Sequence, residues 1–292
     1  MKKIGIVGTG MLGESVGLHL LDVGYEVTAF NRTKYKTENL RKKGAKIVDS
    51  PKQVAENSEL IITIVKDENA VNDVIFEKKS GIISGRHNQM CIADMSTINP
   101  NSTKEISKKV RSCGVDYLEI PVMGGPNVAI DGKLVMMVSG EKEVFEKNKK
   151  VFDSIAEQSF YLGSTGTAHS IKLAMNLQIA MLALSLSEGI TLTKKAGCNP
   201  EVFLKILNST YFKTGMSEGK AYKMTRESYE PTFTLANLKK DLDTIDDAAD
   251  SFNVELPMAK IARKIYTDAN DAGFGDIDYT GIIAYIKELS EK

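Results

Sequence analysis

Three glycines near the start of the chain have the spacing of a phosphate-binding turn. The segment follows a β-branched run and opens a helical pattern, and it consists of Gly8, Thr9, Gly10, Met11, Leu12 and Gly13. In such a turn Gly8 permits the sharp bend, Gly10 lets a pyrophosphate approach the backbone, and Gly13 lets the helix pack closely on the strand. The helix N-terminus adds unpaired N–H groups and a positive dipole end. The segment therefore predicts a dinucleotide site.

The next strand-like run ends at residues that bear on the choice of dinucleotide. A carboxylate at this point would bind the ribose 2′-hydroxyl of NAD and repel a 2′-phosphate. The chain instead has Asn31, Arg32 and Thr33, with Lys34 and Lys36 close behind. This neutral and cationic set suits a 2′-phosphate, so the sequence favours NADP(H) over NAD(H). The alternative is that these side chains only solvate a loop.

Lys172 and Asn176 are four residues apart in an apolar helical pattern, so they share one helix face. A lysine ammonium beside a carbonyl oxygen stabilises the developing alkoxide and donates a proton as hydride reaches the carbon. Asn176 is able to orient the lysine and to hold a substrate without adding charge. Lysines on helices are usually solvated, so the spacing alone does not establish this role.

Taken together, these segments resemble the β-hydroxyacid dehydrogenase family, which includes 3-hydroxyisobutyrate dehydrogenase, tartronate semialdehyde reductase, and the glyoxylate and succinic semialdehyde reductases. The resemblance covers essentially the whole chain. Besides the glycine turn and Asn31-Arg32-Thr33, it rests on Asp94–Thr97, Pro121–Gly125, Gly166–Asn176 and Phe233–Leu242. It implies an NAD(P)-dependent oxidoreductase acting on CH–OH groups, with a Rossmann-type α/β domain and an all-α domain.

The resemblance also implies roles for individual residues. Lys172 and Asn176 would be catalytic and would contact the substrate. The other substrate residues would be Ser96, Thr97, Met123, Gly124, Gly125, Phe233 and Asp241. Further cofactor contacts would come from Val65, Thr97 and Lys240.

The Gly124-Gly125 pair lies in a loop after a strand, where the substrate sites of open α/β sheets are found. Backbone N–H groups at these glycines are able to bind a carboxylate without a bulky side chain. The family commonly has serine where this chain has Met123. The change removes one hydroxyl donor and adds apolar bulk, which leaves the substrate open. The alternative for the glycine pair is a plain tight turn.

For three other residues the sequence leaves two roles open. His169 lies one turn before Lys172 and either tunes that lysine or serves as a cap or core histidine. Asp241 either shapes the cleft or is one more acid in the acidic run of residues 241–255. Val65 either packs beside the adenosine or ribose or has a purely structural role.

The pattern of the chain predicts the elements that carry these residues. Strand-like runs alternate with helical stretches through the first 160 residues, which is typical of parallel βαβ units with helices on both faces. The predicted strands are Lys3–Val7, Glu26–Phe30, Leu60–Val65, Met90–Asp94, Asp116–Ile120, Leu134–Val138 and Phe160–Leu162. Helices are predicted at Met11–Val23 and Pro100–Ser112, and Ser50-Pro51 and Asn99-Pro100 read as helix starts.

After Gly163 strand signals nearly vanish. Helical patterns cover Ala168–Ala196, Pro200–Ser209, Leu235–Phe252, Met258–Gly273 and Thr280–Glu291. We therefore expect a doubly wound NADP-binding Rossmann domain over residues 1–164 and an all-helical domain over residues 165–292. The second domain would begin with a long interdomain helix. That helix is apolar on several sides, and we expect a homodimer or homotetramer.

Composition excludes several classes of protein. Basic and acidic residues each number 38 in the 292-residue chain, so the net charge of zero argues against nucleic-acid binding. Three dispersed cysteines indicate a reducing compartment, and three histidines without CxxC or HExxH predict no metal site. We expect no membrane-spanning segment, because no stretch approaches the roughly 18 apolar residues of a span. We expect no signal peptide, because Gly8, Gly10, Gly13 and Glu14 interrupt the apolar N-terminal run. The expected location is the cytoplasm.

The sequence thus predicts an NADPH-dependent reductase, acting reversibly, of a small carboxylated aldehyde or keto acid such as succinic semialdehyde or glyoxylate. Lys172 would be the general acid. Three alternatives remain: a 3-hydroxyisobutyrate-type dehydrogenase working in the oxidative direction, an imine reductase on the same fold, and a cofactor-sensing or interaction protein with a dead site. Imine reductases typically replace the lysine, which argues against the second.

Overall fold

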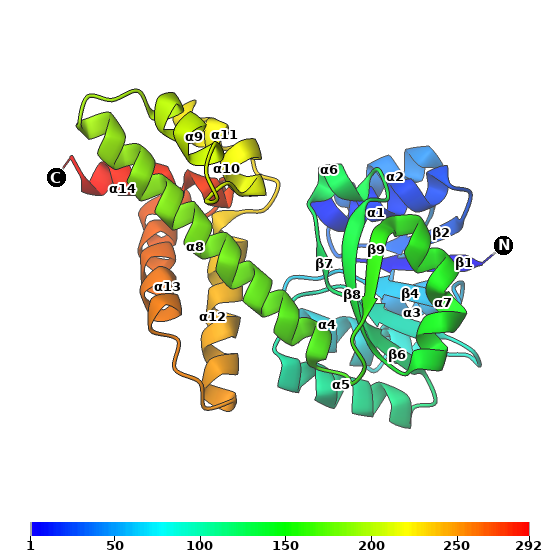
Figure 1. Cartoon of the computed structure of the whole chain (residues 1–292). Helices are drawn as coiled ribbons and strands as arrows, with labels where there is room; N and C mark the ends of the chain where they lie inside the picture. The colour runs from blue at the N-terminus through cyan, green and yellow to red at the C-terminus, as the bar shows by residue number, and fades with distance from the viewer. Residues whose placement is uncertain (1, 292) are drawn as a thin grey trace. The chain divides into compact units, whose positions relative to one another are not determined.

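The computed structural model describes residues 2–291 (Figure 1), which form two compact units. The division falls between Lys172 and Leu173, inside the long helix α8 (Thr167–Lys195). The first unit is an α/β domain and the second is helical, so the predicted fold class is confirmed.

The first unit is built on one sheet with the strand order β3-β2-β1-β4-β5-β6-β8-β7, and β9 pairs with β8. Strand β1 lies at the point where the order reverses, since it pairs in parallel with both β2 and β4. Ligands of doubly wound sheets bind beyond the carboxyl ends of the strands at such a point. The strands are β1 (Lys3–Val7), β2 (Glu26–Phe30), β3 (Lys46–Ile47), β4 (Leu60–Thr63), β5 (Cys91–Asp94), β6 (Asp116–Glu119), β7 (Val122–Met123), β8 (Leu134–Gly140) and β9 (Ala156–Tyr161).

Two strand pairings depart from the parallel arrangement that the sequence predicts, because β8 runs antiparallel to both β6 and β7. A parallel pair needs a crossover of about a dozen residues or more, usually a helix. Between β7 and β8 the chain has only a short connection with the four-residue helix α6 (Pro126–Ala129). The two-residue strand β7 was not predicted, because so short a run has no periodicity.

Helices cover both faces of this sheet. On one face α1, α2 and α7 join the core that includes Ile4, Ile6 and Val27. On the other, α3, α4 and α5 pack on Val7, Ile61 and related residues. The helices of this unit are α1 (Met11–Asp22), α2 (Glu38–Lys43), α3 (Pro51–Ala55), α4 (Glu68–Phe76), α5 (Pro100–Ser112), α6 and α7 (Lys142–Ile155), with 3-10 turns at Lys34–Thr37 and Ile82–Gly85.

The predicted helix starts at two serine or asparagine caps are confirmed. The side chain of Ser50 accepts a hydrogen bond from the Gln53 N–H, and that of Asn99 accepts one from the Asn101 N–H. Proline occupies the first helical position in both, where its missing N–H has no intrahelical partner to lose.

The second unit packs its helices around α12. Leu235, Leu238, Leu242 and Ile245 recur every three or four residues along α12 and are buried with residues of α13 and α8. The helices that follow α8 are α9 (Pro200–Asn208), α10 (Gly215–Gly219), α11 (Ala221–Thr225), α12 (Leu235–Ser251), α13 (Pro257–Ala269) and α14 (Ile282–Leu289), with a π-helical turn at Asn270–Phe274 and a 3-10 turn at Tyr279–Gly281.

Helix α8 is long and apolar enough to cross a membrane by length and composition alone, with a mean hydropathy of 1.4 in its most apolar window. The expectation that no segment has this character was therefore wrong. The core helix of a soluble protein has the same composition, and 44% of that window is buried inside the protein. Asn176 and Ser187 are buried on this helix, and the Ser187 hydroxyl donates to the Ala183 carbonyl at 2.7 Å.

Candidate active site

The glycine turn after β1 has the geometry that its spacing predicts. Gly8 has a φ of +99°, which favours glycine, and a Cβ there would run into the carbonyl of Ile64. A Cβ at Gly13 would meet the carbonyl of Gly8, so α1 packs closely on the turn. A Cβ at Gly10 would meet nothing within 4 Å. The protein thus leaves space at the position where a pyrophosphate would approach.

The first turn of α1 offers free donors beside that space. The first intrahelical hydrogen bond runs from the Glu14 N–H to the Gly10 carbonyl at 2.8 Å. The N–H groups of Met11 and Leu12 precede it and point out of the helix N-terminus. These amides, together with the dipole, form the phosphate-binding end that the sequence predicts.

Side-chain hydrogen bonds of Thr9 and Asn31 hold the turn. The Thr9 side chain is buried and its hydroxyl donates to the Lys36 carbonyl at 2.8 Å. The Thr9 N–H donates to the side-chain oxygen of Asn31 at 3.0 Å, and the Asn31 amide donates to the Thr33 carbonyl at 3.0 Å. Asn31 also lines the cleft described next, and cofactor contacts by Thr9 and Asn31 stay predictions.

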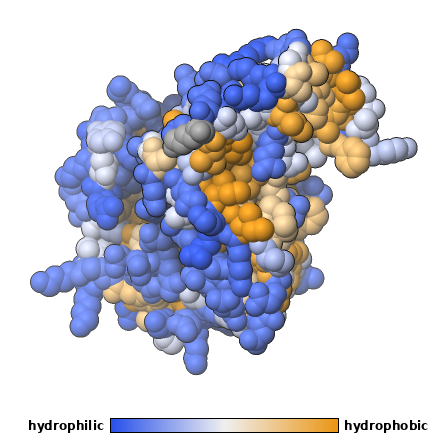
Figure 2. Space-filling view, turned by 90° about the vertical axis from the view of Figure 1, so that its left-hand side faces the viewer, coloured by the Kyte–Doolittle hydropathy of each residue, from blue (hydrophilic) through white to orange (hydrophobic). Residues whose placement is uncertain are grey.

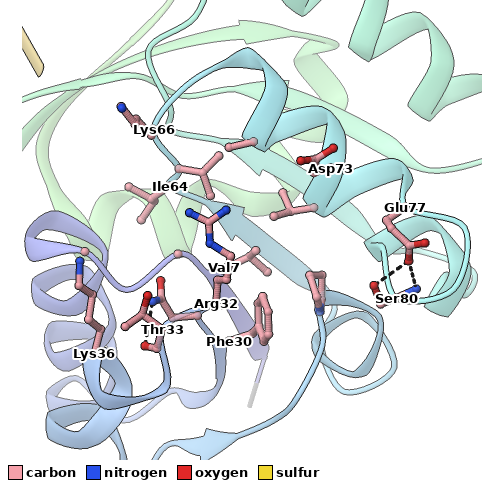
Figure 3. A pocket seen from close by; sticks show the side chains of 17 residues that line it. Val7, Phe30, Arg32, Thr33, Lys36, Ile64, Lys66, Asp73, Glu77 and Ser80 are labelled. Carbon is pink, nitrogen blue, oxygen red and sulfur yellow. Dashed lines mark hydrogen bonds between the residues drawn. The ribbon is translucent and has the colours of Figure 1, made fainter. Parts of the chain in front are cut away.

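A cleft of about 630 Å³ opens at the carboxyl ends of β1, β2 and β4. Figure 3 shows the Arg32 guanidinium extending into it, with Lys36 along one side and Glu77 and Ser80 at the far end. Arg32 and Lys36 make no ion pair within residues 2–291, whereas Lys34 is paired with Asp49 at 2.8 Å. The other lining residues are Val7, Gly8, Gly10, Phe30, Asn31, Thr33, Pro51, Ile64, Val65, Lys66, Ala70, Asp73 and Val74.

The donors and the volume of this cleft fit a nicotinamide dinucleotide. The glycine turn offers amides for a pyrophosphate, and Val65 and Val74 are apolar residues of the lining. Glu77 is a carboxylate at the far end, and hydrogen bonds from the Ser80 hydroxyl and N–H lower its pKa. Arg32 and Lys36 are cationic residues of the lining.

The segment that follows β5 is fixed by a buried carboxylate. Asp94 accepts from the Thr63 hydroxyl at 2.7 Å and from the Ser96 N–H at 3.2 Å. The Ser96 hydroxyl in turn accepts from the Val65 N–H at 3.0 Å. These bonds join Ser96 to Val65 in the loop that lines the cofactor cleft. The next residue, Thr97, is half-buried.

A second buried carboxylate, Glu119, holds the start of α8. One of its oxygens accepts from the N–H groups of Gly166, at 2.5 Å, and Ala168, at 3.3 Å. The other pairs with Nδ1 of His169, whose Nε2 contacts the Ser96 carbonyl at 2.8 Å. Burial opposes the charged imidazole, but the hydrogen bond and charge of Glu119 outweigh it and raise the pKa of His169.

This network settles where His169 lies and adds a residue that the sequence did not single out. His169 is a buried residue that links α8 to the Ser96 segment one turn before Lys172. Glu119 was not proposed as a site residue. The available signal was an acid inside the apolar run that precedes Pro121, since a fully buried acid needs a partner.

Lys172 lies beside the loop that follows β6. Its ammonium Nζ is 3.4 Å from the thioether sulfur of Met123 at the end of β7. Gly124 follows with a φ of +118°, and Gly125 caps α6. The predicted substrate segment and the predicted general acid are thus brought together within the first unit.

Within the second unit Asn176 and Asp241 form a buried pair. The Asn176 amide donates to Oδ2 of Asp241 at 2.6 Å, and the Lys240 ammonium pairs with Oδ1 at 2.5 Å. The side-chain oxygen of Asn176 is buried with no hydrogen-bond partner in residues 2–291. Asp241 is only 2% exposed, which rules out the alternative that it is one more surface acid.

Phe233 lies in a loop that a polar anchor holds. Its ring meets Tyr279 edge-on, with ring centroids 6.0 Å apart, and Thr234 caps α12. Asp278 accepts from Thr232 and Thr280 and pairs with the Lys220 ammonium at 3.2 Å. The loop that carries Phe233 is therefore tied down from both sides.

The described residues contain no group of three or more His, Cys, Asp or Glu side chains arranged to hold a metal ion. The remaining acids of the run 241–255 are largely paired, since Arg263 bonds Asp243 at 2.8 Å and Asp246 at 2.7 Å.

Two family models match the chain. Residues 3–163 match the NAD binding domain of 6-phosphogluconate dehydrogenase, and residues 166–286 match the NAD-binding domain of NADP-dependent 3-hydroxyisobutyrate dehydrogenase. Together they span both units.

Curated relatives resemble the chain over nearly its whole length. Glyoxylate/succinic semialdehyde reductase 1 of Arabidopsis thaliana is 31% identical, with 98% of each chain covered. Cytokine-like nuclear factor N-PAC of Gallus gallus is 30% identical over 98% of this chain and 52% of its own length.

Among solved structures, 3-hydroxyisobutyrate dehydrogenase from Salmonella typhimurium has a TM-score of 0.89 at 24% identity, covering 98% of this chain and all of that one. The shared fold, the matching family models and the relatives agree. The chain therefore belongs to the β-hydroxyacid dehydrogenase family of NAD(P)-dependent oxidoreductases acting on CH–OH groups.

Proposed function

We propose that the protein is an NADPH-dependent reductase of a small carboxylated aldehyde or keto acid, with Lys172 as the general acid. The observation that carries the proposal is the placement of the Lys172 ammonium beside the Met123–Gly125 loop, on a helix start that Glu119 and His169 fix. Its relative in Arabidopsis thaliana is named for two such substrates.

The first unit supplies the groups that this reaction needs. Bound reduced nicotinamide supplies the hydride. Lys172 donates a proton to the carbonyl oxygen and stabilises the charge that develops there. The N–H groups of Gly124 and Gly125 have no acceptor among the turn and loop hydrogen bonds of residues 2–291, and they suit a substrate carboxylate.

The second unit supplies the Asn176–Asp241–Lys240 cluster. The unpartnered side-chain oxygen of Asn176 is an acceptor that suits the hydroxyl of the hydroxy-acid product, while Asp241 fixes the amide orientation. Breaking that pair would leave a buried polar group unsatisfied, at a cost of about 1–3 kcal/mol.

The preference for NADPH is supported by Arg32 and Lys36, which line the cleft without ion-pair partners in residues 2–291. Lys172 argues against an imine reductase. The reaction is reversible, so oxidation of the hydroxy acid uses the same groups.

The test is initial-rate measurement with a panel of semialdehydes, keto acids and cyclic imines, each with NADPH and NADH. We expect turnover of carboxylated aldehydes and a preference for NADPH. Lys172→Ala should bind NADPH normally but lose about 10²–10⁴-fold in kcat, the usual contribution of a general acid. Near-normal turnover by this variant, or cyclic imines as the preferred substrates, would overturn the proposal.

A further inference from the structure

The group that faces Lys172 in the substrate loop is a thioether. Met123 Sδ lies 3.4 Å from Nζ of Lys172, and both side chains are half-buried. A thioether sulfur is a weak hydrogen-bond acceptor and a polarizable apolar surface. The ammonium is thus lined on this side by a group that neither neutralises it nor offers a donor to a substrate.

The loop around Met123 is likewise apolar. Pro121 to Ile130 contains no charged and no hydroxyl side chain, and Asn127 is its one polar side chain. A Cβ at Gly124 would press on Val128 and Leu134, so these apolar side chains close in behind the loop. The polar groups that the loop offers a ligand are mainly the amides of Gly124 and Gly125.

The contact places the sulfur beside any substrate that approaches Lys172 from the loop. A carbonyl oxygen bonded to Lys172 sits about 2.9 Å from Nζ, and its carbon is about 1.2 Å beyond. Because Sδ is itself 3.4 Å from Nζ, a carbonyl that approaches Nζ from the Met123 side brings the atom attached to its carbon within reach of the Met123 side chain.

The chemical nature of that neighbouring atom decides whether its contact with the Met123 thioether is favourable. A carboxylate or hydroxyl placed against a thioether loses water without gaining a donor, and an unsatisfied buried polar group is strongly unfavourable. A methylene at the same place gains dispersion contact with sulfur and methyl.

We propose that Met123 is a specificity-determining residue that selects carboxylated aldehydes whose carbonyl carbon bears an apolar carbon. It disfavours those whose carbonyl carbon bears a carboxylate directly. The inference rests on the proposed function. Succinic semialdehyde represents the first class, because two methylenes separate its aldehyde from its carboxylate, and glyoxylate represents the second.

The experiment compares kcat/KM for succinic semialdehyde and glyoxylate, with NADPH, in the wild type and three variants. Met123→Ser adds a hydroxyl donor and removes the bulk. Met123→Leu keeps an apolar side chain without sulfur. Met258→Ser is the matched control, because Met258 is an exposed methionine on α13.

We expect the wild type to favour succinic semialdehyde, and Met123→Ser to shift the ratio toward glyoxylate by about tenfold or more, as a change in pocket contacts of this size does. Met123→Leu and Met258→Ser should keep the wild-type preference. Thermal unfolding of all four proteins checks that the Met123→Ser chain folds, and the Met123→Leu result carries the test if it does not.

The outcomes separate the two proposals. Failure of the wild type to reduce these two aldehydes and every other semialdehyde and keto acid of the panel would overturn the proposed function. A wild type that reduces both, with glyoxylate equal or better, would overturn the inference alone. An unchanged ratio in a folded Met123→Ser protein, or a ratio in Met123→Leu that moves as far toward glyoxylate, would do the same.

Discussion

The cationic side chains near the cofactor cleft differ in whether they form an ion pair with an acidic side chain. Lys34 is close to the cleft in sequence, but its ammonium is paired with Asp49. Arg32 and Lys36 line the cleft instead. In the sequence the three residues look equivalent. The structure distinguishes Lys34 from the other two, because its partner Asp49 is 15 positions away.

Arg32→Ser should therefore weaken NADPH binding far more than NADH binding. A hydrogen bond to a charged group contributes about 1.5–3 kcal/mol, so the affinity for NADPH should fall about 10- to 100-fold. Fluorescence titration with each nucleotide measures this. Lys34→Ser is the control, and its affinity for both nucleotides should stay near that of the wild type. Equal weakening of both nucleotides by Arg32→Ser would show that the guanidinium does not bind the 2′-phosphate.

Individual site residues were predictable where the signal is local. The spacing of Gly8, Gly10 and Gly13 states the turn geometry directly, and each glycine has the surroundings that the motif requires. Glu119 was not predictable in this way, because its partners are 47 to 50 positions further along the chain. The contact of Lys172 with Met123 spans 49 positions and was equally invisible to spacing.

At the scale of elements, most of the longer strands and helices were predicted, and the two-residue strands β3 and β7 were missed. β1 and β2 match their predicted bounds, as does α5. α7 was not predicted, although its buried residues recur every three or four positions from Phe145 to Ile155. Strand β8 runs antiparallel to β6 and β7 because the connection before it is short. Its direction was not predictable from the strand pattern alone, since it depends on which strands β8 pairs with.

The start of α8 should depend strongly on Glu119. Glu119→Gln breaks a fully buried pair with His169, and loss of one partner of such a pair costs about 3–5 kcal/mol. Urea unfolding measures the free energy of unfolding. The control is Glu141→Gln, which removes an exposed pair with Arg111 and should cost less than about 1 kcal/mol. Similar losses in the two variants would contradict the assigned role.

Across the whole molecule, the two units should respond to pH in opposite directions. The pKa of His169 is raised in the fold, since Glu119 outweighs burial. Its contribution is complete below the unfolded pKa of about 6.5 and is lost as pH rises through the folded value. The pKa of Asp278 is lowered: burial opposes this, but bonds from Thr232 and the charge of Lys220 prevail. Its contribution is present above about 3.9 and is lost as pH falls through the folded value.

Hydrogen exchange followed by mass spectrometry resolves the units separately. We expect protection in the first unit to fall on the alkaline side and protection in the second to fall on the acid side. Asp278→Asn should flatten the acid dependence of the second unit and leave the first unchanged. A parallel response of both units in the wild type would show that these groups do not govern their stability.

The second unit also exposes apolar surface that water does not favour. The view of Figure 2 shows separate apolar areas among the polar surface. On and after α9, Val202 is 53% exposed, Ile206 61% and Phe212 75%. Val202 and Ile206 are four residues apart and share one face of α9, and adjoining apolar side chains exposed on a surface mark interaction sites.

We expect a second copy of the chain to cover residues near α9. Sedimentation at micromolar concentration should show species larger than 32 kDa, and Ile206→Asp should shift them toward the monomer. Lys205→Asp, one position along the same helix, is the control and should not. A wild type that sediments only as a monomer would refute this expectation.

The cap that Glu119 places on α8 also bears on the order in which the chain folds. A serine or threonine cap lets a helix nucleate from its own sequence. Here the cap comes from a residue 47 positions earlier, so the loop between Glu119 and Gly166 must be closed for the first turn of α8 to be held. The residues that line the cofactor cleft lie between Val7 and Ser80, in the same unit as that closure. A dinucleotide that binds the folded first unit would stabilise it by mass action, and with it the closure that holds the turn carrying Lys172.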